Sequence, residues 1–134
     1  MARRVALDTG VLIALEKLGP AQDGILQPDD DVGLSPIVLA EYRVGIACAQ
    51  LEYQPRMKLF LTRFLHSATL LPYDDKVLEE HVRLLIWTRR HGLPRGQHDL
   101  IIAATAAATG RTLVTFDKRA HFDELPGVDA QVLG

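Results

Sequence analysis

Short apolar segments alternate with longer segments of helical periodicity along this chain. Segments of three or four largely apolar residues predict buried strands, and they lie at 5–7, 32–34, 69–71, 112–115 and, more weakly, 129–132. The helical periodicity predicts helices at 11–18, 36–53, 56–66, 75–90 and 98–109. Strands that alternate with helices indicate a parallel sheet covered on both faces. The expected fold class is therefore α/β, an α/β/α sandwich with a central, mostly parallel sheet of four to five strands.

Polar residues, glycine and proline set the predicted helix ends. Ser35 followed by Pro36 is a favoured start of a helix, and that helix is expected to stop before Pro55. Gly110 closes the last predicted helix. The loop composition of residues 19–24 indicates an exposed connection.

The composition fits one globular domain spanning residues 1–134. Apolar residues make up 48% and charged residues 24%, which excludes a mainly disordered chain. Cys48 is the only cysteine, so an intrachain disulfide is excluded, and its small neighbours favour a buried packing role. No apolar segment reaches the length of a signal peptide core or a membrane helix, so we expect a cytoplasmic protein without membrane contact.

The net charge argues against one class of nucleic-acid binder. Fifteen basic residues against seventeen acidic ones give a net charge of −2. A protein that binds nucleic acid through a basic surface carries much more positive charge. A polyanionic partner must therefore be held by metal ions or by local basic residues, for which the candidates are Arg89, Arg90, Arg95, Lys118 and Arg119. For Arg89 and Arg90, a solvated helix C-terminus is the alternative.

Two acids follow predicted strands. Asp8 comes directly after the strand at 5–7, and Asp117 follows the strand at 112–115 with one residue between. Ligands of parallel sheets bind beyond the carboxyl ends of the strands, so both acids would lie at the binding edge. Each could instead cap the helix or turn that follows it.

Two further acids lie on predicted helices. The residues three and four positions from Glu41 all lack polar side chains, and they are Ile37, Val38, Val44 and Gly45. A buried carboxylate is costly without a partner, so Glu41 requires a hydrogen-bond donor, a base such as Arg43, or a metal ion. Asp99 opens a helix with no other charge before Arg111, and its alternative role is to interact with the helix N-terminus.

Four carboxylates at one sheet edge would suit a metal ion. Their mutual repulsion raises their pKa values until protons or cations relieve the charge. Carboxylate oxygens favour Mg²⁺ or Mn²⁺, and no cluster of histidine and cysteine in the sequence indicates zinc. Such an ion can activate water and neutralise charge on a phosphodiester. A cation bound by the acids would thus allow a protein with a negative net charge to bind a polyanionic substrate.

The same acids carry a family resemblance. Four segments resemble, in order, the motifs of PIN-domain nucleases, and they are 5–9, 41–45, 99–106 and 113–117. Length and motif order resemble the single-domain VapC-type toxins of type II toxin–antitoxin (VapBC) modules, over residues 5–132. The resemblance implies a PIN-like α/β/α sandwich and an endoribonuclease that depends on Mg²⁺, with Mn²⁺ able to substitute. Gly10 departs from the family pattern, in which asparagine or serine is usual.

The resemblance also implies roles for individual residues. The catalytic, metal-binding acids would be Asp8, Glu41, Asp99 and Asp117. The supporting polar residues would be Thr9 and Thr115. Glu41 would either help to hold the ion or orient the attacking water, while the other three acids bind the ion. The histidines nearest to these acids, His98 and His121, are expected to take no part.

Partners are implied in the same way. They are an RNA substrate, a VapB-type antitoxin whose tail blocks the acidic site, and a second copy of the chain in a homodimer or a larger toxin–antitoxin complex. The apolar residues of 37–51 and 60–65 offer surface for either protein contact, although the core could use them equally well.

Other functions stay open at the level of sequence. The chain could instead be a housekeeping PIN nuclease in RNA processing, which has the same fold and a different cellular role. It could also be a non-catalytic metal- or RNA-binding module, which has the same acidic residues but cleaves no RNA. A phosphoacceptor domain also gathers acids at strand ends, but it requires an acidic pair where this chain has Asp8 followed by Thr9 and Gly10. Nothing in the sequence indicates which RNA is cut.

Overall fold

The computed structural model describes residues 2–18 and 24–134. The exposed connection expected at 19–24 lies outside these residues except for Gly24, which forms part of a turn. Within the two described ranges, no helix combines the length and the apolar character that crossing a membrane requires.

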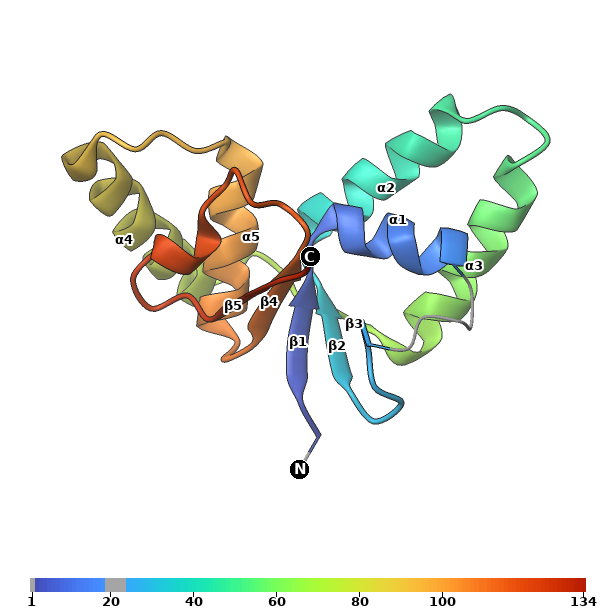
Figure 1. The fold of residues 1–134 in the computed structure, drawn as a ribbon, viewed down its shortest axis with the longest axis horizontal. Helices are drawn as coiled ribbons and strands as arrows, with labels where there is room; N and C mark the ends of the chain where they lie inside the picture. The colour runs from blue at the N-terminus through green and yellow to red at the C-terminus, as the bar shows by residue number, and fades with distance from the viewer. Residues whose placement is uncertain (1, 19–23) are drawn as a thin grey trace.

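The described residues form a five-stranded parallel sheet, as predicted. The strands are β1 (Arg4–Leu7), β2 (Asp31–Leu34), β3 (Thr69–Leu70), β4 (Thr112–Thr115) and β5 (Ala130–Val132). Their order across the sheet is β3-β2-β1-β4-β5, and every pair of neighbours is parallel. The first strand of the chain thus lies in the middle, and its neighbours come from opposite halves of the sequence (Figure 1).

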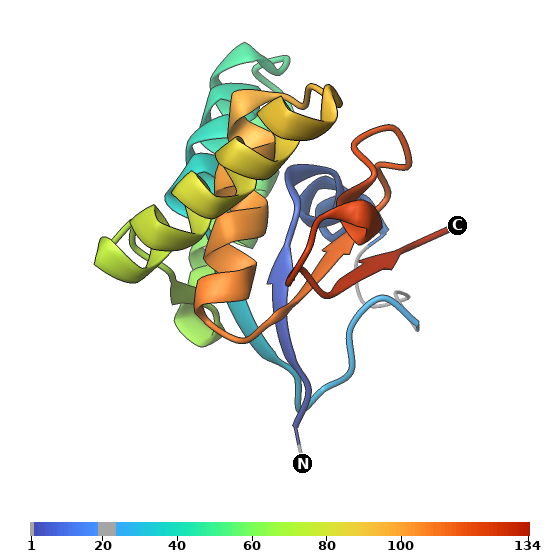
Figure 2. The ribbon, with the colours of Figure 1, turned by 90° about the vertical axis from the view of Figure 1, so that its left-hand side faces the viewer.

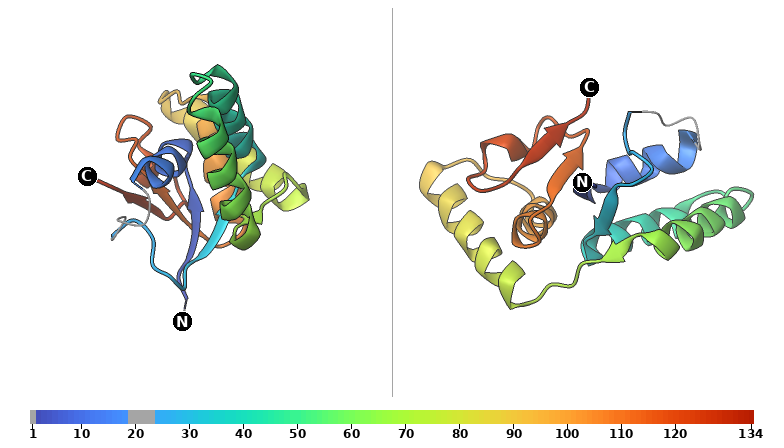
Figure 3. Two further views of the ribbon diagram at one scale, coloured as in Figure 1. Left: turned by 90° about the vertical axis from the view of Figure 1, so that its right-hand side faces the viewer. Right: turned by 90° about the horizontal axis from the view of Figure 1, so that it is seen from below.

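Helices cover both faces of this sheet. They are α1 (Thr9–Leu18), α2 (Pro36–Cys48), α3 (Gln54–Ser67), α4 (Asp75–His91), α5 (Gln97–Ala108) and the short 3₁₀ helix η2 (Phe122–Glu124). Figures 2 and 3 show α2, α3, α4 and α5 on one side of the sheet, with α1 and η2 on the other. The arrangement confirms the α/β/α sandwich.

One helix boundary differs from the prediction. The helix expected to run from 36 to 53 ends at Cys48, and a second helix begins at Gln54, with Pro55 inside its first turn. Proline is tolerated in the first turn because the N–H groups there have no partner within the helix. The side-chain amide of Gln54 donates to the carbonyl of Ala49 at 2.9 Å, which joins the two helix ends. Pro55 therefore begins a helix instead of marking the end of the preceding one.

The burial pattern of α2 also corrects the expectation for Cys48. The helix buries Val38, Tyr42 and Ile46, which recur every four residues and face the core. Cys48 lies two positions beyond Ile46, which is on the opposite side of a helix with 3.6 residues per turn. Its side chain is exposed, so the predicted buried packing role is wrong.

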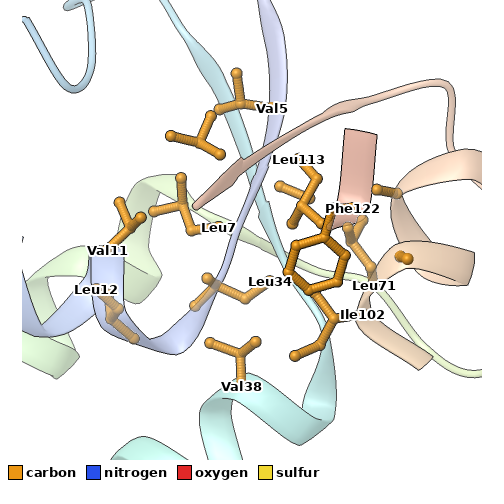
Figure 4. Packing of buried hydrophobic residues seen from close by; sticks show 14 of the residues in the cluster. Val5, Leu7, Val11, Leu12, Leu34, Val38, Leu71, Ile102, Leu113 and Phe122 are labelled. Carbon is orange, nitrogen blue, oxygen red and sulfur yellow. The ribbon is translucent and has the colours of Figure 1, made fainter. Parts of the chain in front are cut away.

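The core lies between the sheet and the helices. Each face of the sheet contributes short apolar side chains, and the alanines of α5 allow that helix to pack closely against β4 and α4. Figure 4 shows the ring of Phe122 in this core together with Leu113 and Ile102. Phe122 is 0% exposed and opens the short helix η2, so it anchors the chain that follows β4.

A buried arginine holds the amino ends of the strands. Arg111, whose side chain is 5% exposed, donates from Nη1 to the carbonyls of Val5 (3.1 Å) and Asp31 (2.7 Å). A Cβ atom on Gly33 would lie 2.5 Å from a Leu71 methyl and 3.0 Å from Nε of Arg111, so only glycine fits there. The sheet is therefore tied together at its amino edge, opposite the edge where the predicted acids lie.

The anchoring role of Phe122 predicts a large loss of stability on truncation. Phe122→Ala should lower the free energy of unfolding by about 3–5 kcal/mol, because the substitution removes a fully buried ring and leaves a cavity. Phe116→Ala is the matched control, since that ring is 39% exposed, and it should cost about 1 kcal/mol or less. Urea denaturation of both variants measures the difference, and equal losses would contradict the anchoring role.

Candidate active site

All four predicted acids lie near the carboxyl edge of the sheet. Asp8 comes directly after β1, Asp117 lies two residues beyond β4, Glu41 is in the middle of α2, and Asp99 is in the first turn of α5. The charges of Asp8, Asp117 and Glu41 all raise the pKa of Asp99, which requires the four carboxylates to be close together. The fold thus gathers residues that are up to 109 positions apart in the sequence.

Asp8 serves the fold with its backbone and faces the site with its side chain. Its N–H continues the sheet by donating to the carbonyl of Val114, and its carbonyl accepts the first hydrogen bonds of α1. The carboxylate accepts from the N–H of Thr9 and from the hydroxyl of Thr115, each at 2.8 Å. The capping alternative therefore holds for the backbone, while the half-buried carboxylate lies in the acidic cluster.

Asp117 caps a turn, as its alternative role predicted. Its Oδ1 accepts from the N–H groups of Arg119 (2.8 Å) and Ala120 (3.1 Å). Its own N–H donates to the hydroxyl of Thr115 at 2.9 Å. Because its charge also raises the pKa of Asp8, Asp117 belongs to the cluster as well as to the turn.

Glu41 has the partners that its position demands. One carboxylate oxygen accepts from the hydroxyl of Thr9 at 2.8 Å, and the other lies 3.6 Å from Nδ1 of His98. These partners take the place of the ion pair with Arg43 that was the alternative. The side chain is 39% exposed, because the apolar stripe around it runs from the core out to Val44, which is 62% exposed. Glu41 therefore lies at the open side of the cluster.

Burial and repulsion together perturb the two inner acids. Burial is the largest cause that raises the pKa of Asp99, followed by the charges of the other three acids, and His98 opposes them. Burial also raises the pKa of Asp8, and hydrogen bonds from Thr115 and Thr9 partly offset the effect. The repulsion expected from the sequence is thus present, and a cation placed between the acids would relieve it.

The two predicted supporting residues bridge the acids. Thr9 joins Asp8 to Glu41 by donating its N–H to the first and its hydroxyl to the second. Thr115 donates its hydroxyl to Asp8 and accepts from the N–H of Asp117. A continuous path of hydrogen bonds therefore runs from Glu41 to Asp117.

The basic residues singled out in the sequence separate into two groups. Arg89, Arg90, Lys118 and Arg119 are exposed. Arg95 is not available for an RNA phosphate, because its side chain is 4% exposed and its guanidinium binds backbone carbonyls of this chain. The sequence offers no signal for this difference, since two of the three carbonyls that Arg95 binds follow it by 25 and 26 positions.

Two further features were not anticipated. Gly96 approaches the acidic cluster so closely that a Cβ atom would lie 3.1 Å from Oδ2 of Asp99. Beside Glu41, a cavity of about 610 Å³ opens between α1, α2 and α3. Its lining is mainly apolar and includes an ion pair between the buried Glu16 and the exposed Arg56, at 3.0 Å. A glycine before a helix and scattered apolar residues on three helices are too common to indicate such features from sequence.

The electrostatics of the cluster predict an unusual dependence of stability on pH. Because the pKa of Asp99 is raised above 3.8 in the folded protein, the folded state binds more protons than the unfolded state between that value and the raised one. The free energy of unfolding therefore falls as pH rises through this window. In EDTA, Asp99→Asn should stabilise the protein at pH 7 and lose that advantage towards pH 4.

Urea denaturation between pH 4 and pH 8 measures this dependence. The exposed residue Asp123 supplies the matched control, because Asp123→Asn removes the same charge outside the cluster. Destabilisation by Asp99→Asn at pH 7, or an equal gain from Asp123→Asn, would contradict the repulsion.

Comparisons with known proteins agree with this geometry. The family model described as "PIN domain" matches residues 5–128. The chain is 34% identical to Ribonuclease VapC5 of Mycobacterium tuberculosis over 111 residues, which cover 83% of this chain and 81% of that protein.

Two solved structures share the fold. The structure of VapBC-5 from Mycobacterium tuberculosis, a member of the VapBC family of toxin–antitoxin systems, matches with a TM-score of 0.77 and 31% identity, covering 97% of this chain and 98% of that one. A chain of VapBC2 from Rickettsia felis, solved with a DNA fragment from its promoter, matches with a TM-score of 0.84 and 23% identity, over 98% and 99% of the two chains. This chain therefore belongs to the PIN-domain family and, within it, to the VapC ribonucleases.

Proposed function

We propose that this chain is a Mg²⁺-dependent endoribonuclease and the toxin of a toxin–antitoxin module. The observation that carries the proposal is the convergence of Asp8, Glu41, Asp99 and Asp117 at the carboxyl edge of a parallel sheet, with the pKa values of Asp8 and Asp99 raised. Such an edge is where ligands of parallel sheets bind, and clustered carboxylates attract cations.

The donor set fits a hard divalent cation. Four carboxylates and two threonine hydroxyls supply only oxygen, which suits Mg²⁺ and allows Mn²⁺ to substitute. In the part of the chain that the structure describes, no group of three or more His, Cys, Asp or Glu side chains is placed so that it could hold a metal ion by itself. Magnesium is usually bound by one or two carboxylates plus water and substrate phosphate, so a closed protein cage is not required.

Each acid has a role that follows from its surroundings. Asp8, Asp99 and Asp117 would hold the ion, since they form the inner part of the cluster. A divalent ion at this position lowers the pKa of an attacking water and offsets negative charge on the phosphate. Glu41 is more exposed than the inner acids and accepts a hydrogen bond from Thr9, so it can orient the water or help to hold the ion.

The substrate would be held by local positive charge, because the net charge is −2. Four exposed basic residues remain as candidates for contact with RNA phosphates, and they are Arg89, Arg90, Lys118 and Arg119. Lys118 and Arg119 directly follow Asp117, so they are placed to meet a phosphate bound at the acids.

The partner protein would be an antitoxin of VapB type, because the solved relatives are toxin–antitoxin complexes. The cavity between α1, α2 and α3 is a suitable docking site, since it is mainly apolar and Glu41 forms part of its wall. An apolar segment seated there could place a basic side chain on the acids and block them. A homodimer and a cytoplasmic location complete the proposal.

Cleavage of RNA by the purified, partner-free chain tests the enzymatic part. With Mg²⁺ or Mn²⁺, a panel of structured RNAs should be cut at discrete positions, and EDTA should stop the reaction. Asp99→Asn should lower the rate at least about 100-fold, because it removes one charge from the cation site. Asp123→Asn, prepared identically, should retain wild-type activity.

Each outcome discriminates between the alternatives. Equal activity of wild type and Asp99→Asn would show a contaminating nuclease or wrong site residues. Metal-dependent cleavage without growth arrest on expression would favour a housekeeping nuclease. Absence of both cleavage and growth arrest would favour a non-catalytic binding module.

The docking cavity gives a separate prediction. A Cβ atom on Gly45, which lines the cavity, would have no atom within 4 Å, so Gly45→Leu should fill the cavity without a clash. The substitution also replaces a poor helix former in α2. We expect binding of the antitoxin encoded beside this chain to weaken at least about tenfold, with RNA cleavage retained, because one large apolar contact is lost.

Copurification with that antitoxin and rescue of growth by it measure the effect. Ala40→Leu adds the same side chain to an exposed position of α2 that does not line the cavity. Unchanged antitoxin binding by Gly45→Leu, or equal weakening by Ala40→Leu, would contradict docking in the cavity.

A further inference from the structure

Arg95 is a buried cation that binds backbone carbonyls and lies 3.5 Å from the carboxylate of Glu124, instead of facing solvent. Its side chain is 4% exposed, and its guanidinium donates to three carbonyls, those of Ala120 (2.7 Å), His121 (3.1 Å) and Leu93 (3.0 Å). The guanidinium also lies over the ring of Trp87 on α4, 5.6 Å from its centre. Removing an arginine from water is costly, so a full set of partners is needed to keep it buried.

These bonds lead directly to the acidic cluster. Ala120 connects Arg95 to Asp117 through its backbone. The carbonyl of Ala120 accepts from Nε of Arg95, and the N–H of Ala120 donates to Oδ1 of Asp117. Asp117 in turn donates its N–H to Thr115, whose hydroxyl donates to Asp8. The path of hydrogen bonds that begins at Glu41 therefore ends at Arg95.

Arg95 also belongs to the segment that carries another acid. It precedes Asp99 by four residues, and Gly96, which packs against the Asp99 carboxylate, is its neighbour. The same guanidinium thus holds the start of α5 against the turn that follows β4. The backbone of His121, which it also binds, has φ +49°, a conformation that side-chain-bearing residues seldom adopt.

We propose that Arg95 is a positioning residue that sets the distance between Asp117 and Asp99 and thereby the affinity of the acids for a divalent cation. The inference rests on the proposed metal-dependent function. A planar guanidinium can donate in fixed directions to carbonyls of two segments at once, whereas an ammonium group is a single point on a flexible stem. Lysine would keep the charge of Arg95 and lose the geometry.

The test compares Arg95→Lys with Arg83→Lys. Arg83 is a fair control because, like Arg95, it donates to a backbone carbonyl in the segment after β4, that of Pro126, but it does so from α4 and away from the acids. In Arg95→Lys, the Mg²⁺ concentration for half-maximal RNA cleavage should rise about 10–100-fold, as for outer-shell changes at other metal sites. The rise in Tm that Mn²⁺ produces without RNA should shrink in parallel. Arg83→Lys should lower Tm and leave both metal readouts unchanged.

A double-mutant cycle shows whether Arg95 acts through Asp117. In an Asp117→Asn background, Arg95→Lys should cause little further loss of the Mn²⁺-induced Tm rise, because the group that Arg95 positions has been altered. Equal effects of Arg95→Lys in both backgrounds would overturn the proposal. So would unchanged metal readouts in Arg95→Lys, or the absence of a Mn²⁺ effect in the wild-type protein.

Two provisions keep the test decisive. If Arg95→Lys does not fold, Trp87→Leu removes the ring beneath the guanidinium while the three carbonyl bonds remain, and it should weaken the Mn²⁺ effect by a smaller factor. An unchanged Mn²⁺ effect in that variant would then overturn the proposal. Wild-type protein that binds Mn²⁺ but cuts no RNA would contradict the proposed function, and the Mn²⁺ readout would still decide the role of Arg95.

Discussion

The pairing of β1 with β4 is the interaction on which the rest of the molecule depends. It sets Leu7 opposite Val114, and the N–H of Asp8 extends the ladder to the carbonyl of Val114. Because the two strands are parallel, both end at the same edge, and the residues that follow them meet there. The hydrogen bond from Thr115 to Asp8 is the direct result. Without this register, the acids of the N-terminal and C-terminal segments would not share a site.

The buried positive charge and the clustered negative charges lie at opposite edges of the sheet. At the amino edge, the buried Arg111 is bound by strand carbonyls and by the carboxylate of Asp31, so its charge is compensated within the fold. At the carboxyl edge, Asp8 and Asp99 are partly buried among like charges and their pKa values are raised. Threonine hydroxyls and backbone N–H groups reduce this repulsion but do not remove it. The unfavourable charge is thus concentrated where a cation can bind.

The sheet and the acidic site could largely be predicted from the sequence because local patterns of apolar and acidic residues indicate them. The strands before Asp8 and Asp117 are apolar and short, and parallel strands imply a common edge. The apolar neighbours of Glu41 indicated a carboxylate in need of a partner. Tertiary contacts decided what the sequence could not predict. Pro55 can either follow or begin a helix, and only packing chooses between them. The burial of Arg95 depends on carbonyls 25 residues away, which no local pattern reports.

The late position of β4 in the chain has a consequence for protein synthesis. When a ribosome has joined the first hundred residues, the nascent chain contains Asp8, Glu41 and Asp99, but neither β4 nor the turn that Arg95 holds. The central strand then lacks one neighbour, and the acids have no common edge on which to meet. The active arrangement can therefore arise only after β4 and the turn that follows it have been made. A protein directed against RNA would thus stay inert beside its own messenger until this segment has been synthesised.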